Sequence, residues 1–355
     1  MSSHPLRSAW LLGLALAGCG GAERGPASSA DSARATSHPG GVALTGAGAT
    51  FPNPIYSKWF DAYARETGVR INYQSIGSGG GIRQFTEGTV DFGATDGPMT
   101  DQQIAAVQGK VLHVPTVLGA VVATYNLPTL GRTALRFDGP TLADIFLGRI
   151  TRWDDRRIAQ LNSGVKLPAQ DILVVHRSDG SGTTYIFTDF LAKVSPEWKR
   201  QVGPTSVEWP VGLGGKGNEG VTQQVLQSDG SIGYVELIYA QSNDLPAAEV
   251  RNAAGAFIAP TLKAVSAAAE GATFAPDTDF RISITNAAGA EAYPIASFTW
   301  LLIHTGDRRT PKDEAIRAFL AWMLEPGPQR MAADLHYAPL PVKLIELVRQ
   351  RLNAS

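Results

Sequence analysis

Four segments of this sequence share one pattern, in which a strand-like apolar run ends in a turn of glycine and hydroxyl residues. They are Gly48-Ala49-Thr50-Phe51, Gly77-Ser78-Gly79-Gly80, Thr95-Asp96-Gly97-Pro98 and Arg177-Ser178-Asp179-Gly180-Ser181-Gly182-Thr183. Three of the four lead into segments with the apolar spacing of a helix. Strands that alternate with helices in this way are typical of an α/β fold.

Apolar periodicity extends this alternation along the chain. Strand patterns cover residues 42–45, 69–76, 89–95, 114–125, 171–176 and 295–303. Helices are predicted from the stripe Ile55, Trp59, Phe60 and Tyr63, which stops at Gly68, from Ile82 onwards, and over 185–191, 312–324 and 342–352. The long β-branched run 114–125 fits a buried strand that passes from one domain to the next. A length of 355 residues is enough for two domains.

Together, the four turns predict a site for a small oxyanion. In open α/β sheets, ligands bind at the carboxyl ends of strands beside helix N-termini, whose free N–H groups and dipole attract negative charge. Each turn alone is a weak signal. A Ser or Thr turn before a helix is usually an N-cap, Arg177 alone fits a surface residue, and Asp96 before Gly-Pro fits an ordinary turn. The prediction rests on their occurring together.

The composition excludes several classes of protein. A formal net charge of −1 with no basic block argues against nucleic-acid binding, which needs clustered Lys and Arg. The single cysteine rules out an intrachain disulfide and a cysteine-rich metal site. The histidines His113, His176, His304 and His336 lack the close spacing of metal ligands. We therefore expect neither a metal nor a cofactor.

The N-terminus has the pattern of an export signal. Arg7 precedes the apolar run 9–17, which is too short to span a membrane, since spanning takes about 20 residues. The sequence Leu16-Ala17-Gly18-Cys19 resembles the bacterial lipobox, which implies cleavage after residue 18 and fatty acylation, with palmitate, of Cys19. An ordinary secretory signal with an incidental cysteine is the alternative. Loss of Arg7 would leave a net charge of −2.

Residues 19–41 are predicted to follow the signal as a lipidated, flexible tether. This stretch is rich in Gly, Ala, Ser and Pro and has no apolar period. A tether behind a lipid anchor would hold an exported domain at a membrane, in the periplasm or cell envelope.

Several longer motifs carry a specific resemblance. They are ALTGAGATFPNPIYSKWF, NYQSIGSGGG, VDFGATDGPMT, PTLADIFLGRITRWDD, VVHRSDGSGTTYIFTDFL, WPVGLGGKGNEGV and SIGYVELIYA. In these, from Leu44 to Leu340, the chain resembles the phosphate-binding proteins of bacterial ABC-type phosphate importers. The resemblance implies a two-lobed, type II-like periplasmic-binding-protein fold with crossing hinge strands. It places lobe I at 42–123 plus 295–355 and lobe II at 124–294.

The resemblance also assigns roles to residues. The phosphate donors would be Thr50, Phe51, Ser78, Arg177, Ser181, Gly182 and Thr183, with Asp96 as the acceptor and Asp179 orienting Arg177 by an ion pair. No residue would be catalytic. A monomer would capture inorganic phosphate and deliver it to a membrane permease driven by an ATPase.

Asp96 has a physical role in this scheme. Two like unit charges 4 Å apart repel by roughly 4 kcal/mol at an effective dielectric constant of about 20. A carboxylate is therefore tolerated only if the ligand brings a proton, as phosphate does and sulfate does not. The departures from the family pattern are small: Gly79 replaces a common Ser, and Thr95 and Gly97 flank Asp96 where Ser and Ala are common.

Other interpretations remain open at the level of sequence. A serine hydrolase or phosphatase is disfavoured, because Asp179 stands where a G-x-S-x-G elbow around Ser181 needs Gly. A sulfate- or molybdate-binding protein and a structural lipoprotein or adhesin are further alternatives. The segment 212–217 fails the P-loop test, because Pro210 and Gly217 occupy two of its required positions. We interpret it as a surface loop, with the edge of the cleft as the alternative.

Overall fold

The computed structural model describes residues 41–202, 207–274, 279–306 and 310–355. The predicted signal peptide, Cys19 and nearly all of the tether lie outside the described residues. The strands are β1 (Ala43–Gly48), β2 (Arg70–Ser75), β3 (Phe92–Thr95), β4 (Lys110–Tyr125), β5 (Arg136–Phe137), β6 (Leu173–Arg177), β7 (Leu213–Gly215), β8 (Ser231–Glu236), β9 (Glu249–Arg251), β10 (Phe257–Ile258) and β11 (Ala296–Thr305).

The helices alternate with these strands, as an α/β fold requires. They are α1 (Asn53–Thr67), α2 (Ser78–Thr86), α3 (Asp101–Ala105), α4 (Gly139–Phe146), α5 (Arg156–Leu161), α6 (Gly182–Val194), α7 (Pro196–Gln201), α8 (Gly217–Gln227), α9 (Leu237–Gln241), α10 (Leu262–Glu270), α11 (Pro311–Met323), α12 (Pro326–Ala333) and α13 (Val342–Ala354). Within the described ranges, no helix is both long and apolar enough to cross a membrane.

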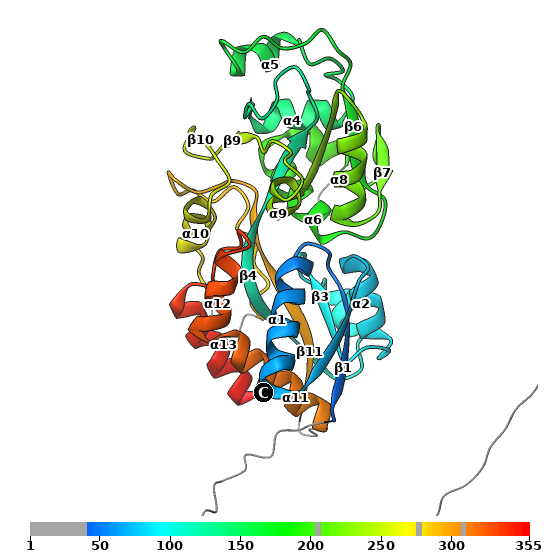
Figure 1. The fold of residues 1–355 in the computed structure, drawn as a ribbon, viewed down its shortest axis with the longest axis vertical. Coiled ribbons are helices and arrows are strands. Elements are labelled where there is room, and N and C mark those ends of the chain that lie inside the picture. The colour runs from blue at the N-terminus through cyan, green and yellow to red at the C-terminus, as the bar shows by residue number, and fades with distance from the viewer. Residues whose placement is uncertain (1–40, 203–206, 275–278, 307–309) are drawn as a thin grey trace, which may run out of the picture. The chain divides into compact units, whose positions relative to one another are not determined.

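One mixed sheet runs through the described part of the chain, in the order β2-β1-β3-β11-β4-β8-β6-β7. Strand β1 is parallel to β2 and β3, while β4 is antiparallel to β11 and to β8. Strand β4 changes partner along its length, pairing with β11 from Lys110 to Ala120 and with β8 from Val121 to Tyr125. It thereby joins two lobes, the upper and the lower in Figure 1, by running from one into the other.

The first lobe contains β1–β3 with helices α1, α2 and α11–α13, and the second contains β6–β8 with helices α4–α9 (Figure 1). Helix α1 buries Ile55, Trp59, Phe60 and Tyr63, the stripe predicted from spacing. It ends at Gly68, whose φ of 77° is the left-handed conformation that glycine adopts without strain.

Helix α2 begins at Ser78, four residues before the predicted start at Ile82. Runs of glycine disfavour helices, so the sequence pattern placed residues 78–81 in a loop. Packing outweighs this preference. A Cβ atom on Gly81 would lie 2.6 Å from the carbonyl oxygen of Ala47 and 2.8 Å from that of Ala94, so only glycine lets α2 lie this close to β1 and β3.

The segment 212–217 also differs from its predicted structure. We interpreted it as a surface loop, and most of it is exposed, but residues 213–215 form β7, which pairs in parallel with β6, and Gly217 begins α8. Strand β7 therefore brings the start of α8 next to the turn that follows β6.

Candidate functional site

The four predicted turns meet between the two lobes. The first lobe contributes the ends of β1 and β3 and the start of α2, and the second contributes the turn from β6 into α6. The amide of Gly79 donates a hydrogen bond of 2.8 Å to the carbonyl oxygen of Gly180 across the lobes. Gly182 lies so close to Asp96 that an added Cβ would be 2.7 Å from the Asp96 amide nitrogen. Sequence positions about 100 residues apart thus form one site.

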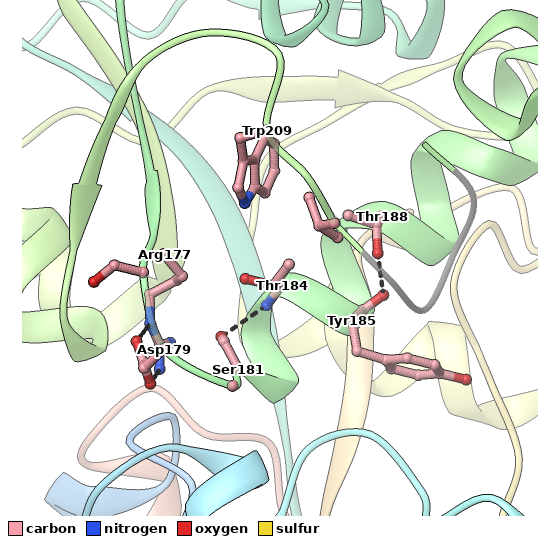
Figure 2. A pocket seen from close by; sticks show the side chains of 10 residues that line it. Arg177, Asp179, Ser181, Thr184, Tyr185, Thr188 and Trp209 are labelled. Carbon is pink, nitrogen blue, oxygen red and sulfur yellow. Dashed lines mark hydrogen bonds and ion pairs between the residues drawn. The ribbon is translucent and has the colours of Figure 1, made fainter. Parts of the chain in front are cut away.

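Helix N-termini face this site from both lobes. Helix α2 starts at Ser78 and helix α6 at Gly182, so each presents its first free N–H groups there. Ser181 is the N-cap of α6, and its hydroxyl accepts from the Thr184 amide at 3.0 Å (Figure 2). Thr50, Ser78 and Thr183 are all buried, so their hydroxyl groups are shielded from solvent.

Arg177 brings the positive charge to the site and is itself buried. Its Nε and Nη2 atoms donate to the two carboxylate oxygens of Asp179 at 2.8 and 2.5 Å, a bidentate pair that fixes the guanidinium plane (Figure 2). Burial alone would raise the pKa of Asp179, but its hydrogen bonds and the charge of Arg177 hold that pKa below the ordinary value. The predicted ion pair is therefore present.

Asp96 is the acidic residue at the centre of the site. It is 1% exposed, and its Oδ1 accepts from the Thr299 hydroxyl at 2.8 Å. Its backbone amide donates to Ser78 Oγ at 3.2 Å. Burial raises the pKa of Asp96 to about 7, against the lowering effects of Thr299, Arg177 and Ser78. A carboxyl group in this state can accept a proton from a ligand or hold one itself near neutral pH.

This set of groups is suited to holding an anion. One guanidinium group, several hydroxyls and two helix N-termini supply donors, and Asp96 supplies one acceptor. In the described ranges, no group of three or more His, Cys, Asp or Glu side chains is placed to hold a metal ion.

Comparison with known proteins gives the family. A family model described as a PBP superfamily domain matches residues 27–326. The phosphate-binding protein PstS of Xylella fastidiosa (strain 9a5c) is 45% identical over 308 residues, covering 86% of this chain and 84% of that protein. The PstS of Pasteurella multocida (strain Pm70) is 44% identical over 307 residues, covering 86% and 88%. The chain belongs to the PstS family of phosphate-binding proteins.

Solved structures show the fold that this family membership implies. A high affinity periplasmic phosphate-binding protein (PfluDING) bound with phosphate has a TM-score of 0.69 and 23% identity, covering 87% of this chain and 93% of that one. A phosphate-binding protein from Stenotrophomonas maltophilia has a TM-score of 0.67 and 21% identity, covering 87% and 94%. The predicted two-lobed periplasmic-binding-protein fold is thereby confirmed.

The structure brings the predicted site residues of this PstS-family chain together. They are Thr50, Phe51, Ser78, Asp96, Arg177, Asp179, Ser181, Gly182 and Thr183. Their contacts with a ligand remain predictions. Cys19, the predicted lipidation site, lies outside the described residues.

Four residues that hold the site were not predicted. The hydroxyls of Tyr239 and Tyr337 donate to the carbonyl oxygens of Thr50 and Phe51 at 2.5 and 2.6 Å. Thr299 holds Asp96, and Asn218 contacts both Thr50 and Thr183. Asn218 lies in the motif WPVGLGGKGNEGV, so the resemblance contained a signal for it, although the surface-loop interpretation of 212–217 obscured that signal.

Proposed function

We propose that this protein captures one inorganic phosphate ion between its lobes and delivers it to the permease of an ABC-type phosphate importer, which an ATPase drives. The observation that carries the proposal is the convergence of donors from both lobes on the buried Asp96. The names of the curated relatives support the same ligand. In this proposal, lobe I comprises residues 42–123 and 295–355, and lobe II comprises 124–294. The change of partner along β4 near Val121 supports this division.

In the proposed complex, phosphate oxygens accept hydrogen bonds from both lobes. The donors are the Thr50, Ser78, Ser181 and Thr183 hydroxyls, the Arg177 guanidinium and the backbone amides of Thr50, Phe51, Gly182 and Thr183. Asp96 accepts a hydrogen bond from the protonated oxygen that phosphate carries near neutral pH. Sulfate has no such proton, so it cannot donate to the buried carboxylate and would meet its charge directly, which disfavours its binding.

We further propose that the site binds its ligand without chemical conversion. The Ser181 hydroxyl accepts a hydrogen bond from the Thr184 amide as the N-cap of α6, which is a structural role. A hydrolase would need a base in contact with its nucleophile. The relatives, which are named as binding proteins, support the same conclusion.

The proposal includes the setting in which the protein works. Removal of residues 1–18 and acylation of Cys19 would anchor a monomer, through the tether 19–41, to a membrane of the periplasm or cell envelope. One acyl chain binds a membrane only marginally, so stable anchoring would need multiple acylation of Cys19.

Calorimetric titration of the purified protein, stripped of bound ligand, tests the proposed function. At pH 8 we expect one phosphate to bind per molecule and sulfate to give no heat at the same concentration. Equal binding of both anions would indicate a protein for another tetrahedral oxyanion. Binding of neither anion would overturn the proposal.

A further inference from the structure

Asn218, in the first turn of α8, donates hydrogen bonds to two residues of the site. It is fully buried. Its Nδ2 atom donates to Thr50 Oγ1 at 2.8 Å and to Thr183 Oγ1 at 3.1 Å, while its backbone amide donates to Thr50 Oγ1 at 3.1 Å. Thr50 belongs to the first lobe, and Thr183 and Asn218 belong to the second. One amide group thus contacts a hydroxyl from each lobe.

The orientation of this amide group is fixed by its third contact. Asn218 Oδ1 accepts from the backbone amide of Glu236 at 2.9 Å. A backbone N–H can only donate, so the oxygen of the side chain must face Glu236. The NH₂ group must therefore face the two threonine hydroxyls and donate to them.

This arrangement determines what the Thr50 hydroxyl can do. A hydroxyl oxygen has two acceptor positions and one hydrogen to donate. Asn218 fills both acceptor positions of Thr50 Oγ1, one with its backbone amide and one with Nδ2. The Thr50 hydroxyl can then only donate, and its hydrogen must point away from Asn218.

The Thr183 hydroxyl is constrained in the same way. Its Oγ1 accepts from Asn218 Nδ2 at 3.1 Å and from Arg177 Nη1 at 3.3 Å. Both acceptor positions are again filled, which leaves the hydrogen free to donate. Ser78 differs, because its hydroxyl accepts from the Asp96 amide and can turn its hydrogen toward Asp96 Oδ2, 3.4 Å away.

We propose that Asn218 is a positioning residue that makes the hydroxyls of Thr50 and Thr183 obligate donors, one in each lobe. The inference rests on the proposed function, since the acceptor for both hydrogens is the bound phosphate. It explains how a site built of hydroxyl groups, which can donate or accept, presents only donors to an anion at these two positions. Asp96 is then left as the acceptor that discriminates.

A double-mutant cycle measured by phosphate titration tests this role. We expect Asn218→Ala to weaken phosphate binding about ten- to hundredfold, the range for misdirecting a hydrogen bond to a charged group. In a protein that already carries Thr50→Val and Thr183→Val, the same change should have almost no effect, because no hydroxyl remains to be oriented. If Asn218 had a merely structural role, its replacement would weaken binding by the same factor in the wild-type protein and in the double valine variant.

Two further variants guard against misfolding. Asn162→Ala is the matched control, since Asn162 is also a buried asparagine but donates to the carbonyl oxygens of Arg136 and Ile158. It should lower the melting temperature and leave phosphate affinity unchanged. If Asn218→Ala does not fold, Asn218→Leu replaces it in the cycle. Leucine fills the buried site without adding a charge and removes the donor to the two hydroxyls.

The outcomes separate the two proposals. If the wild-type protein does not bind phosphate, the proposed function fails and this inference fails with it. If the wild-type protein binds phosphate and Asn218→Ala binds as tightly, or loses the same factor in both backgrounds, only the role of Asn218 is overturned. A loss that disappears without the two hydroxyls supports it.

Discussion

At the scale of single residues, Asp96 combines a cost in stability with the selectivity that we propose for the site. Its pKa is raised to about 7, because burial removes water from the ionised form. The folded protein therefore binds a proton that the unfolded chain releases above pH 3.8, the ordinary value. Stability should fall as pH rises from 3.8 to about 7 and stay lower above that range.

The variant Asp96→Asn should remove this dependence on pH. Asparagine stays neutral, so at pH 8 we expect the ligand-free variant to be more stable than the wild-type protein by about 2–4 kcal/mol. The advantage should shrink as the pH approaches 3.8. Chemical denaturation of both proteins at several pH values measures this difference. A difference that does not change with pH would show that Asp96 is not the group responsible.

The sequence predicts such residues only where a local pattern marks them. Asp96 and Arg177 stand in recognisable turns at the ends of strands. Thr299 and Asn218 contact residues 203 and 168 positions away, and no local pattern relates them to those partners. Their roles follow from the pairing of β11 with β3 and from the position of β7 beside β6.

At the scale of elements, the start of α6 packs tightly against the start of α2 and the end of β3. A Cβ atom on Gly182 would lie 2.7 Å from both Cβ and the amide nitrogen of Asp96, and closer still to Ser78 Oγ. These atoms belong to the opposite lobe. Glycine at this position is therefore what allows the two lobes to approach each other at the site.

We expect Gly182→Ala to hinder closure while leaving each lobe folded, since alanine favours the helix that it would begin. Phosphate affinity should fall about hundredfold or more, and X-ray scattering should lose any contraction that phosphate causes in the wild-type protein. Gly327→Ala is the matched control, because Gly327 lies in the first turn of α12 and an added methyl group meets no atom within 4 Å. Wild-type closure by Gly182→Ala would contradict this account.

Element boundaries show where the sequence pattern succeeds and where packing overrides it. The end of α1 at Gly68 was predicted correctly, because a glycine C-cap is a local feature. The start of α2 was predicted too late, because the run Gly79–Gly81 disfavours a helix locally but allows close packing on β1 and β3. At the start of α2, within the site, the low helix propensity of glycine and the close packing that glycine allows therefore favour different structures.

At the scale of the whole molecule, the described residues form two lobes joined by long strands. The sequence indicated a crossing strand at 114–125, and the structure extends it to Lys110–Tyr125. The pairing of β4 with β11 joins segments almost 200 residues apart, which apolar periodicity alone does not predict. The resemblance to a known family supplied the lobe arrangement that local pattern could not.

In the proposed function, Asp96 makes this site accept an anion that carries a proton and reject one that does not. The most direct test is to measure phosphate and sulfate affinities of the wild-type protein and Asp96→Asn at pH 8. We expect the wild-type protein to bind phosphate alone. Asp96→Asn should bind sulfate measurably, and its preference for phosphate should fall about tenfold or more, since asparagine adds no charge and can donate a hydrogen bond. Wild-type selectivity in Asp96→Asn would contradict the account.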